Sequence, residues 1–320
     1  MYKNCLLCPR RCAVDRETGQ LGYCGESSAL RLGFAGIHRG EEPPITGGGG
    51  SGTIFISGCN LGCAFCQNFQ ISQKGLGRAV SLKEFAEICL ALQEKGAENI
   101  NIVTGSHAVP ALALGIEEGR KQGLFIPVLW NSSGYDGPET LEILKDFVDV
   151  YLPDLKTLDK EIAAKYFSTD DYPEYASRAI LAMIKHRKLK FGSGRSGSGM
   201  VMLSGVMIRH LVLPGHLENT RQVLKWFSEN CSGTGGGKAL LSLMTQYTPV
   251  NTGSQKQGAV SETPNRYVSG EEYEAVLSML EEYAIEDGFC QELVTGSDWL
   301  PDFRQPNPFS SKLSVPVWHY

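Results

Sequence analysis

Three cysteines lie close together in one loop, and their spacing constrains this chain more than any other feature. They are Cys59, Cys63 and Cys66, in the order C-x3-C-x2-C, and they follow the apolar run 53–56. Thiolates are soft ligands that favour iron–sulfur clusters and zinc. A cubane [4Fe–4S] cluster normally takes four thiolates, so three in one loop leave one iron without a protein ligand. An open coordination position of that kind is where a metal site does chemistry.

Composition narrows the class of protein further. The chain has 320 residues, of which 42% are hydrophobic, and this is enough for a large core. Its net charge of −5 argues against broad non-specific binding of nucleic acid. The chain starts without an apolar run of signal-peptide length, and no stretch approaches a membrane span. We therefore expect a cytoplasmic protein, without a membrane partner, whose grouped cysteines are metal ligands rather than disulfides.

Strand-like and helix-like segments alternate after residue 53. The expected strands are 53–57, 100–104, 126–130, 148–152, 206–213 and 239–244. The expected helices are 81–95, 109–122, 138–147, 159–166, 172–186, 218–230 and 270–287. Alternation at this spacing implies parallel strands with right-handed crossovers. The fold class is therefore α/β, a partial (β/α)6 barrel of the TIM type with a Cys-rich N-terminal extension.

The same pattern suggests three parts of the chain. Residues 1–50 form a Cys-rich metal-binding extension, 51–298 the barrel core, and 299–320 an irregular tail rich in proline and aromatic residues. Within the core, 188–199 is a low-complexity insertion that reads as a mobile surface loop, and 233–237 and 252–262 also read as loops. The glycine-rich run 47–52 precedes a strand and contains no GKS or GKT, so we expect a flexible approach to the strand rather than a phosphate-binding loop.

The cysteine loop resembles a known family. The stretch GSGTIFISGCNLGCAFCQN, with Phe65 before the last cysteine, resembles the signature of radical S-adenosylmethionine (SAM) enzymes, in the branch related to pyruvate formate-lyase activating enzymes. The resemblance implies that Cys59, Cys63 and Cys66 hold a [4Fe–4S] cluster whose fourth iron is chelated by SAM. It implies that one electron cleaves SAM into methionine and a 5′-deoxyadenosyl radical, which abstracts hydrogen from a substrate. A structural zinc site is the alternative, and it would need a fourth ligand nearby.

The resemblance also places polar residues at the carboxyl ends of the strands, where such barrels carry their chemistry. Asp154 and Lys156 share one side of their strand by alternation. In the resembled family this pair lines the SAM site, where the lysine meets the SAM carboxylate. An arginine inside an apolar strand is unusual, and the family places one against SAM. The full set of residues that we expect to contact the cofactor is Phe65, Asn68, Ser106, Asn131, Ser133, Asp154, Lys156 and Arg209.

Other polar residues near these strand ends have two readings. His107 is either a substrate-side polar group or a hydrogen-bonded residue at the barrel mouth. His210 points away from Arg209 by alternation, and we expect it to be packed at the core edge. Asn131 stands where the activating enzymes carry an aspartate beside a monovalent cation, so the lost charge puts that cation site in doubt. Gln246 and Tyr247 stand near the end of the sixth strand, where the activating enzymes carry a histidine.

A second group of cysteines stands at the N-terminus, in the spacing C-x2-C-x3-C-x11-C. Its members are Cys5, Cys8, Cys12 and Cys24. Four thiolates in twenty residues fit a closed zinc site or a second iron–sulfur cluster, and thiolate count alone does not separate the two. We expect the neighbouring Arg10 and Arg11 to be solvated. The isolated Cys89, Cys231 and Cys290 are expected to be small buried apolar residues.

Three hypotheses for function follow. The first is a radical SAM oxidoreductase that abstracts hydrogen from a protein glycine, as glycyl-radical activating enzymes do. The second is a radical SAM enzyme that acts on a small metabolite or RNA. The third is a non-enzymatic zinc-binding protein. The first two imply a [4Fe–4S] cluster, SAM and an electron donor such as flavodoxin or ferredoxin. The sequence does not identify the substrate, the N-terminal metal, the oligomeric state, or whether SAM is consumed or regenerated.

Overall fold

A computed structural model describes residues 1–195, 197, 199–232, 237–250, 263–297 and 299–320. Its strands are β1 Leu30–His38, β2 Ser51–Ile56, β3 Arg78–Val80, β4 Ile100–Val103, β5 Val128–Ser132, β6 Val150–Pro153, β7 Lys190–Ser193, β8 Met200–Leu211, β9 Leu240–Met244, β10 Gly288–Cys290 and β11 Ser314–His319. Its helices are α1 Pro43–Thr46, α2 Phe69–Ser72, α3 Leu82–Glu94, α4 Val109–Lys121, α5 Pro138–Leu144, α6 Lys160–Phe167, α7 Tyr172–His186, α8 Leu217–Asn230 and α9 Gly270–Glu282, with a 3₁₀ turn at Arg16–Thr18.

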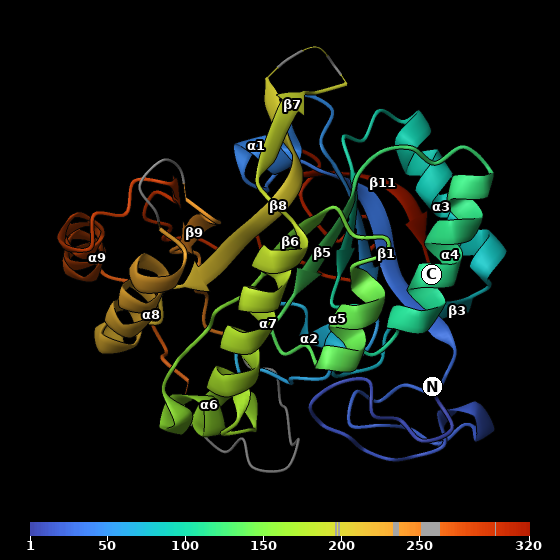
Figure 1. Ribbon diagram of the computed structural model, residues 1–320, viewed down its shortest axis with the longest axis horizontal. Helices are drawn as coiled ribbons and strands as arrows, with labels where there is room; N and C mark the ends of the chain where they lie inside the picture. The colour runs from blue at the N-terminus through green and yellow to red at the C-terminus, as the bar shows by residue number, and fades with distance from the viewer. Residues whose placement is uncertain (196, 198, 233–236, 251–262, 298) are drawn as a thin grey trace.

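The main sheet is parallel over most of its width. Its strands follow the order β10-β9-β8-β6-β5-β4-β2-β1-β11, and neighbouring strands from β2 to β10 run parallel. β1 pairs antiparallel with both β2 and β11 and closes that end of the order. The sheet is curved and open, and helices α3, α4, α5, α7 and α8 lie along its outside (Figure 1). The predicted α/β partial barrel is confirmed, and all six predicted strands are present.

The helices form where the sequence indicates. The Ser81 hydroxyl caps α3 by accepting the Glu84 N–H at 3.1 Å, and Gly96, with φ +91°, follows its end. The buried face of α3 carries Phe85, Ile88 and Leu92, which are spaced for one side of a helix. Among the described residues, no helix is long and apolar enough to cross a membrane.

Two predicted loops are more ordered than expected. Part of the insertion 188–199 forms β7, which pairs antiparallel with β8; residues 196 and 198 lie outside the described part. The glycine-rich run is a close-packed turn, because a Cβ at Gly49 would lie 2.0 Å from the Gly96 carbonyl oxygen. The Gly49 N–H donates to the Glu98 carboxylate at 3.0 Å. The flexible-approach reading was therefore wrong. The predicted loops at 233–236 and 252–262 lie outside the described residues.

The C-terminal tail also departs from the prediction. Residues Ser314–His319 form β11 and pair with β1, so the tail is not irregular throughout. Its aromatic residues pack against the barrel, and the Phe309 ring lies 5.4 Å from the Phe55 ring of β2. β1 and β11 are separated by nearly the whole chain. No local sequence pattern predicts that they pair, because each strand by itself looks like an isolated apolar stretch. The division into parts at 50 and 298 stays a prediction.

The isolated cysteines follow the prediction in two cases of three. Cys89 in α3 and Cys231 after α8 are fully buried among apolar side chains. Cys290 in β10 is exposed, so the expectation of a buried residue was wrong there. Its short strand pairs with β9 at the end of the main sheet, and such an end is less covered than the centre.

Candidate functional site

One cavity of about 290 Å³ opens at the carboxyl ends of the parallel strands. This position is where ligands bind in folds of this kind. Ten of the eleven residues predicted for the catalytic and cofactor site line it. They are Cys59, Cys63, Phe65, Cys66, Asn68, Asn131, Ser133, Asp154, Lys156 and Arg209.

The cysteine loop between β2 and α2 presents three thiols to this cavity. The Leu61 N–H donates to Cys59 Sγ at 3.3 Å, and Ser72 Oγ lies 3.3 Å from Cys66 Sγ. Burial raises the pKa of Cys66 to about 11, although the Ser72 hydroxyl lowers it in part. Burial likewise raises the pKa of Cys63, and the nearby Lys156 opposes that rise. The metal-free Cys63 and Cys66 thiols are therefore protonated at neutral pH, and binding of a metal releases their protons.

Aromatic packing fixes the loop from behind. The Phe65 ring makes edge contacts with Tyr166, Phe167 and Tyr247, at centroid distances of 5.9, 5.8 and 5.4 Å. The Tyr247 hydroxyl donates to the Pro264 carbonyl at 2.8 Å, so Tyr247 is part of this support. Gln246 lines the cavity instead, and its carbonyl accepts a hydrogen bond from Gln67 at 3.0 Å.

Asp154 and Lys156 follow β6 and both face the cavity, as alternation predicts. The Lys156 ammonium donates to Asp154 Oδ2 at 2.6 Å, and the two side chains are 17% and 21% exposed. Burial alone lowers the pKa of Lys156, but Asp154, Cys63 and Tyr172 together raise it by more, so this lysine stays charged. An ammonium has three N–H donors, and the bond to Asp154 uses one. The pair therefore presents a charged donor to the cavity.

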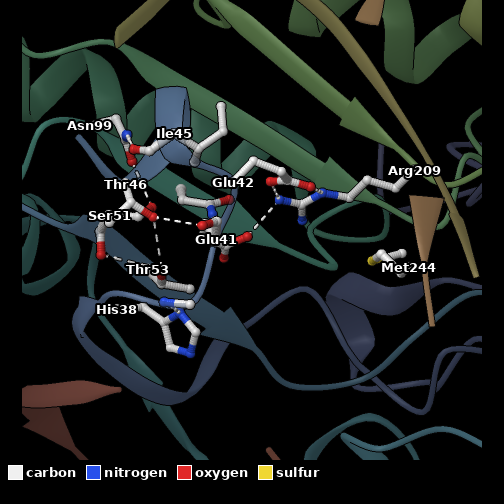
Figure 2. Close-up of polar contacts among 12 residues, drawn as sticks. His38, Glu41, Glu42, Ile45, Thr46, Ser51, Thr53, Asn99, Arg209 and Met244 are labelled. Atoms are coloured by element: carbon white, nitrogen blue, oxygen red, sulfur yellow. Dashed lines mark hydrogen bonds and ion pairs between the residues drawn. The ribbon is translucent and has the colours of Figure 1, made fainter. Parts of the chain in front are cut away.

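Arg209 in β8 lies between two carboxylates of the chain itself. Its Nε donates to Glu42 Oε1 at 2.9 Å, and its Nη2 donates to Glu41 Oε2 at 2.5 Å (Figure 2). All three side chains are largely buried. Burial alone lowers the pKa of Arg209, and Glu42 and Glu41 raise it by more. Burial alone raises the pKa of Glu42, and Arg209 lowers it by more. These two glutamates precede the Pro-Pro start of α1, and the sequence analysis missed them.

Two buried polar atoms in the cavity wall lack a partner. Ser133 Oγ, after β5, and Trp299 Nε1, in the tail, make no hydrogen bond to any described part of the chain. Both residues line the cavity. A buried hydroxyl or indole N–H without a partner costs free energy, which a bound ligand recovers. Thr104 also lines the cavity, at a φ of +64°, and this is strained for a β-branched residue.

Ser106 is the one predicted residue that the structure places elsewhere. Its hydroxyl donates to Asp136 Oδ1 at 2.6 Å, and the Ser132 hydroxyl donates to Asp136 Oδ2 at 2.6 Å. Burial raises the pKa of Asp136, and these hydrogen bonds oppose that rise. Ser106 therefore ties the loop after β4 to the loop after β5, and it does not line the cavity.

His210 and His107 are buried residues with hydrogen-bond partners in the chain, and neither lines the cavity. Both ring nitrogens of His210 have partners, the Leu155 carbonyl at 2.7 Å and the Thr220 hydroxyl at 3.0 Å, as expected for a packed residue. His107 is buried, and its Nε2 lies 2.7 Å from the Ser57 carbonyl oxygen. It lies outside the cavity wall, so the hydrogen-bonded reading holds. His38, at the end of β1, does line the cavity and was not predicted.

The sequence of this chain is similar to those of known proteins. The profile of the Radical SAM superfamily matches residues 53–216. The "Uncharacterized protein MJ0674" of Methanocaldococcus jannaschii is 31% identical over 297 residues, which cover 89% of this chain and 77% of that protein.

Solved structures resemble the chain more distantly. Streptococcus suis SuiB bound to S-adenosylmethionine is 14% identical with a TM-score of 0.48, over 76% of this chain and 49% of that one. The FeFe-hydrogenase maturase HydG of Carboxydothermus hydrogenoformans is 14% identical with a TM-score of 0.47, over 80% and 60%. A domain of pyruvate-formate lyase-activating enzyme from Bacteroides vulgatus is 14% identical with a TM-score of 0.36, over 57% and 91%. This chain spans about half the length of SuiB.

The residues of the cavity fit the cofactors that this superfamily implies. Three thiols in one loop match a [4Fe–4S] cluster with an open iron. The ammonium of Lys156, the carboxylate of Asp154 and the unpartnered hydroxyl of Ser133 match the charged and polar groups of an amino acid joined to a nucleoside.

Proposed function

This chain belongs to the radical SAM superfamily, and we propose that it cleaves SAM reductively at a [4Fe–4S] cluster held by Cys59, Cys63 and Cys66. When bound, the cluster supplies the electron for that cleavage, and the resulting radical abstracts hydrogen from the substrate. One observation carries the proposal for the site: the three thiols share a cavity with the Asp154–Lys156 pair and with the unpartnered Ser133 hydroxyl.

We propose that different residues of the cavity bind different groups of SAM. We assign the SAM carboxylate to Lys156, whose ammonium is charged and has donors beyond its bond to Asp154. Asp154 holds that ammonium and offers its other oxygen to the SAM amino group. Asn131 near the end of β5 offers its amide group to the ribose, and Ser133 directly after β5 offers its hydroxyl. Phe65 and Asn68 flank the thiols, where Phe65 is fixed by its aromatic neighbours.

The walls of the cavity limit access of water. Residues of the tail, Trp299, Pro301 and Phe309, line it together with Phe55 of β2. An apolar wall around a radical protects it from side reactions with solvent. The tail therefore has a part in the reaction although it lies far from the cysteines in sequence.

For the substrate, we propose a glycine residue of a polypeptide, as in the glycyl-radical activating enzymes that the cysteine loop resembles. The one-electron donor would be a flavodoxin or a ferredoxin. A small metabolite or an RNA is the other outcome of the test below. We favour the polypeptide because the resemblance extends over residues 1–310, except for the insertion.

The test of the chemistry uses anaerobically reconstituted protein with SAM and dithionite. We expect 5′-deoxyadenosine from the wild type and none from Cys59→Ala, Cys63→Ala or Cys66→Ala, each with reduced iron content. Cys290→Ala is the matched control, because Cys290 is exposed in β10 and lies outside the cavity. Product from the three variants at the wild-type rate would contradict the assignment.

The test of the substrate uses the same protein with a glycyl-radical protein encoded beside it in the genome. We expect the electron paramagnetic resonance doublet of a glycyl radical to appear in that partner. Absence of the doublet, together with SAM cleavage stimulated by a metabolite or RNA, would assign the second class of substrate and reject the first.

A further inference from the structure

We propose that Cys5, Cys8, Cys12 and Cys24 bind a second metal centre through their thiolates, either an iron–sulfur cluster or a zinc ion, and that the N-terminal lobe built on it holds the loop that carries Cys59. We define this lobe as residues 1–28. The proposal concerns a site outside the SAM cavity, and it stands whether or not the proposed substrate is right.

The four thiols are gathered in the lobe by short backbone bonds. The Cys5 N–H donates to the Val14 carbonyl at 3.1 Å, and the Ala13 N–H donates to the Cys5 carbonyl at 3.0 Å. A Cβ at Gly22 would lie 3.4 Å from Cys24 Sγ and 3.7 Å from Cys12 Sγ. The space beside these two sulfurs is therefore kept free of side chain by a glycine. Cys5, Cys8 and Cys24 are buried, and Cys12 is half-buried.

A buried cation next to the thiols points to negative charge there. Arg16 is 1% exposed, and its guanidinium donates to the carbonyl oxygens of Glu26, Ser27 and His107. It also donates to Cys5 Sγ at 3.6 Å. These oxygen acceptors are neutral carbonyls, and the Arg16 guanidinium also lies 4.7 Å from the centre of the Tyr2 ring. No carboxylate pairs with it among the ion pairs of the described residues, and a buried cation is costly without a counter-charge. Thiolates on a metal centre supply that charge, because metal binding deprotonates them.

Hydrogen bonds to sulfur add to the case. The Tyr23 N–H donates to Cys12 Sγ at 3.3 Å. Donors of this kind, with the Arg16 guanidinium on Cys5, stabilise thiolate ligands and tune the centre that they hold. The half-buried Cys12 thus has a partner that favours the ligand form.

Four thiolates suit either of two centres. Zinc at about 2.3 Å from each sulfur draws four sulfurs to within roughly 3.8 Å of one another. An iron–sulfur cluster keeps its thiolates further apart, because each binds a different iron. The two centres share the thiolate chemistry, and the metal content separates them.

The lobe is bonded directly to the loop of the SAM cavity. The Cys59 N–H donates to the Cys24 carbonyl at 3.3 Å, so a ligand of one group touches a ligand of the other. Arg10 donates to the carbonyls of Asn60 at 2.9 Å and Leu61 at 3.0 Å, and its guanidinium lies 3.8 Å from the centre of the Tyr23 ring. The expectation that Arg10 is solvated was therefore wrong. A centre that fixes Cys24 also fixes the position of Cys59.

The experiment counts metal in the full-length chain. Wild type, the triple variant Cys59→Ser/Cys63→Ser/Cys66→Ser and the control Cys290→Ser are reconstituted anaerobically with ferrous iron and sulfide, with zinc present at an equal concentration. Iron, zinc and acid-labile sulfide are then measured per chain. If the N-terminal centre is a cluster, we expect about eight irons in wild type and in the control, and about four irons with about four sulfides in the triple variant. If it is zinc, we expect about four irons and one zinc in wild type and in the control, and about one zinc without iron in the triple variant.

A triple variant with neither iron nor zinc would overturn the N-terminal metal centre, and the two other outcomes identify which metal it holds. Failure of wild type to cleave SAM would contradict the proposed function and leave this count unaffected. The two proposals therefore fail separately.

A second variant tests the bond between the lobe and the loop. Arg10→Met keeps all seven cysteines of the two groups and removes the donors to Asn60 and Leu61. We expect normal iron content but faster loss of iron to a chelator, with Arg11→Met, whose Glu139 pair is exposed, as the matched control. Equal rates of iron loss in both variants would reject the link between lobe and loop.

Discussion

Two charged groups stand at neighbouring strand ends of the cavity, and they are partnered differently. Lys156, after β6, pairs with one carboxylate, and both side chains keep about a fifth of their surface exposed. Arg209, in β8, pairs with two carboxylates, and its side chain is 8% exposed. The Asp154 backbone forms a parallel bridge with Arg209, so the two groups share the same strand ends.

The different partners indicate different roles for the two cations: one binds the ligand, and the other holds a segment of the chain in place. The positive charge of Arg209 is already matched by Glu41 and Glu42, so a SAM carboxylate there would meet a net negative environment. Lys156 pairs with one carboxylate, and its ammonium has N–H donors beyond the bond to Asp154. We therefore infer that Arg209 mainly anchors residues 41–42 against β8, while Lys156 is the cation that meets the ligand. The predictions below test this division.

The largest effect is expected from Arg209→Met. The change leaves Glu41 and Glu42 buried without a cation, and removal of one partner from a buried ion pair costs about 3–5 kcal/mol. Urea unfolding at pH 7 measures the loss. The triple variant Arg209→Met/Glu41→Gln/Glu42→Gln should recover most of it, because no uncompensated charge remains. A loss below about 1 kcal/mol in the single variant would show that this group is not an anchor.

A smaller effect is expected from Lys156→Met, and it should appear in binding rather than in folding. Loss of one charge-assisted hydrogen bond costs about 1.5–3 kcal/mol, so SAM should bind roughly ten- to a hundredfold more weakly. Equilibrium dialysis on the reconstituted protein measures this. Lys83→Met is the control, since Lys83 in α3 is 78% exposed. If both variants bind SAM like the wild type, Lys156 is not the ligand.

The pH dependence of the free energy of unfolding also tests whether Arg209 anchors the chain through its charge. Arg209 holds the pKa of Glu42 below its ordinary value of 4.5, although burial alone raises it. A lowered pKa gives stability that is present above about pH 4.5 and lost as the pH falls further. In Arg209→Met the largest lowering influence is lost and burial is opposed only by hydrogen bonds from Ser242 and the backbone, so the pKa of Glu42 rises and the variant gains relative stability as the pH falls.

The stability deficit of Arg209→Met should therefore shrink between pH 7 and pH 4, by about 1.4 kcal/mol for each pH unit by which the pKa of Glu42 in the variant exceeds pH 4. Urea unfolding at pH 7, 5.5 and 4 measures the trend. A deficit that stays constant over this range would mean that loss of Arg209 does not bring the pKa of Glu42 into it, and the anchor would then not act through charge.

The sequence predicted the positions of these groups better than their partners. Alternation along β6 correctly placed Asp154 and Lys156 on one side, because that rule is local. The partners of Arg209 are Glu41 and Glu42, which are 168 and 167 residues away, and no periodicity connects them with Arg209. Ser106 was predicted from its place after β4, yet its hydroxyl is taken by Asp136, which the sequence analysis did not consider.

The parts of the fold that were missed have the same cause. β1 and β11 pair across almost the whole chain, and neither belongs to the β/α repeat that revealed the other strands. The glycine run 47–52 looked flexible because its composition suits a linker, whereas its turn is fixed by contact with Gly96 and Glu98. Repeating local patterns were predictable, and long-range contacts between single elements were not.

The smallest effect is expected at an ion pair that resembles the anchor in distance alone. Arg221 of α8 lies 2.6 Å from Glu282 of α9, but the two side chains are 36% and 51% exposed. Water already solvates both charges, so the ion pair adds little to the free energy of unfolding. Removal of one partner leaves the other charge in contact with water. Arg221→Met should unfold in urea within experimental error of the wild type. If it falls as far as Arg209→Met, burial is not what makes Arg209 an anchor, and the contrast with Lys156 must rest on the number of carboxylates instead.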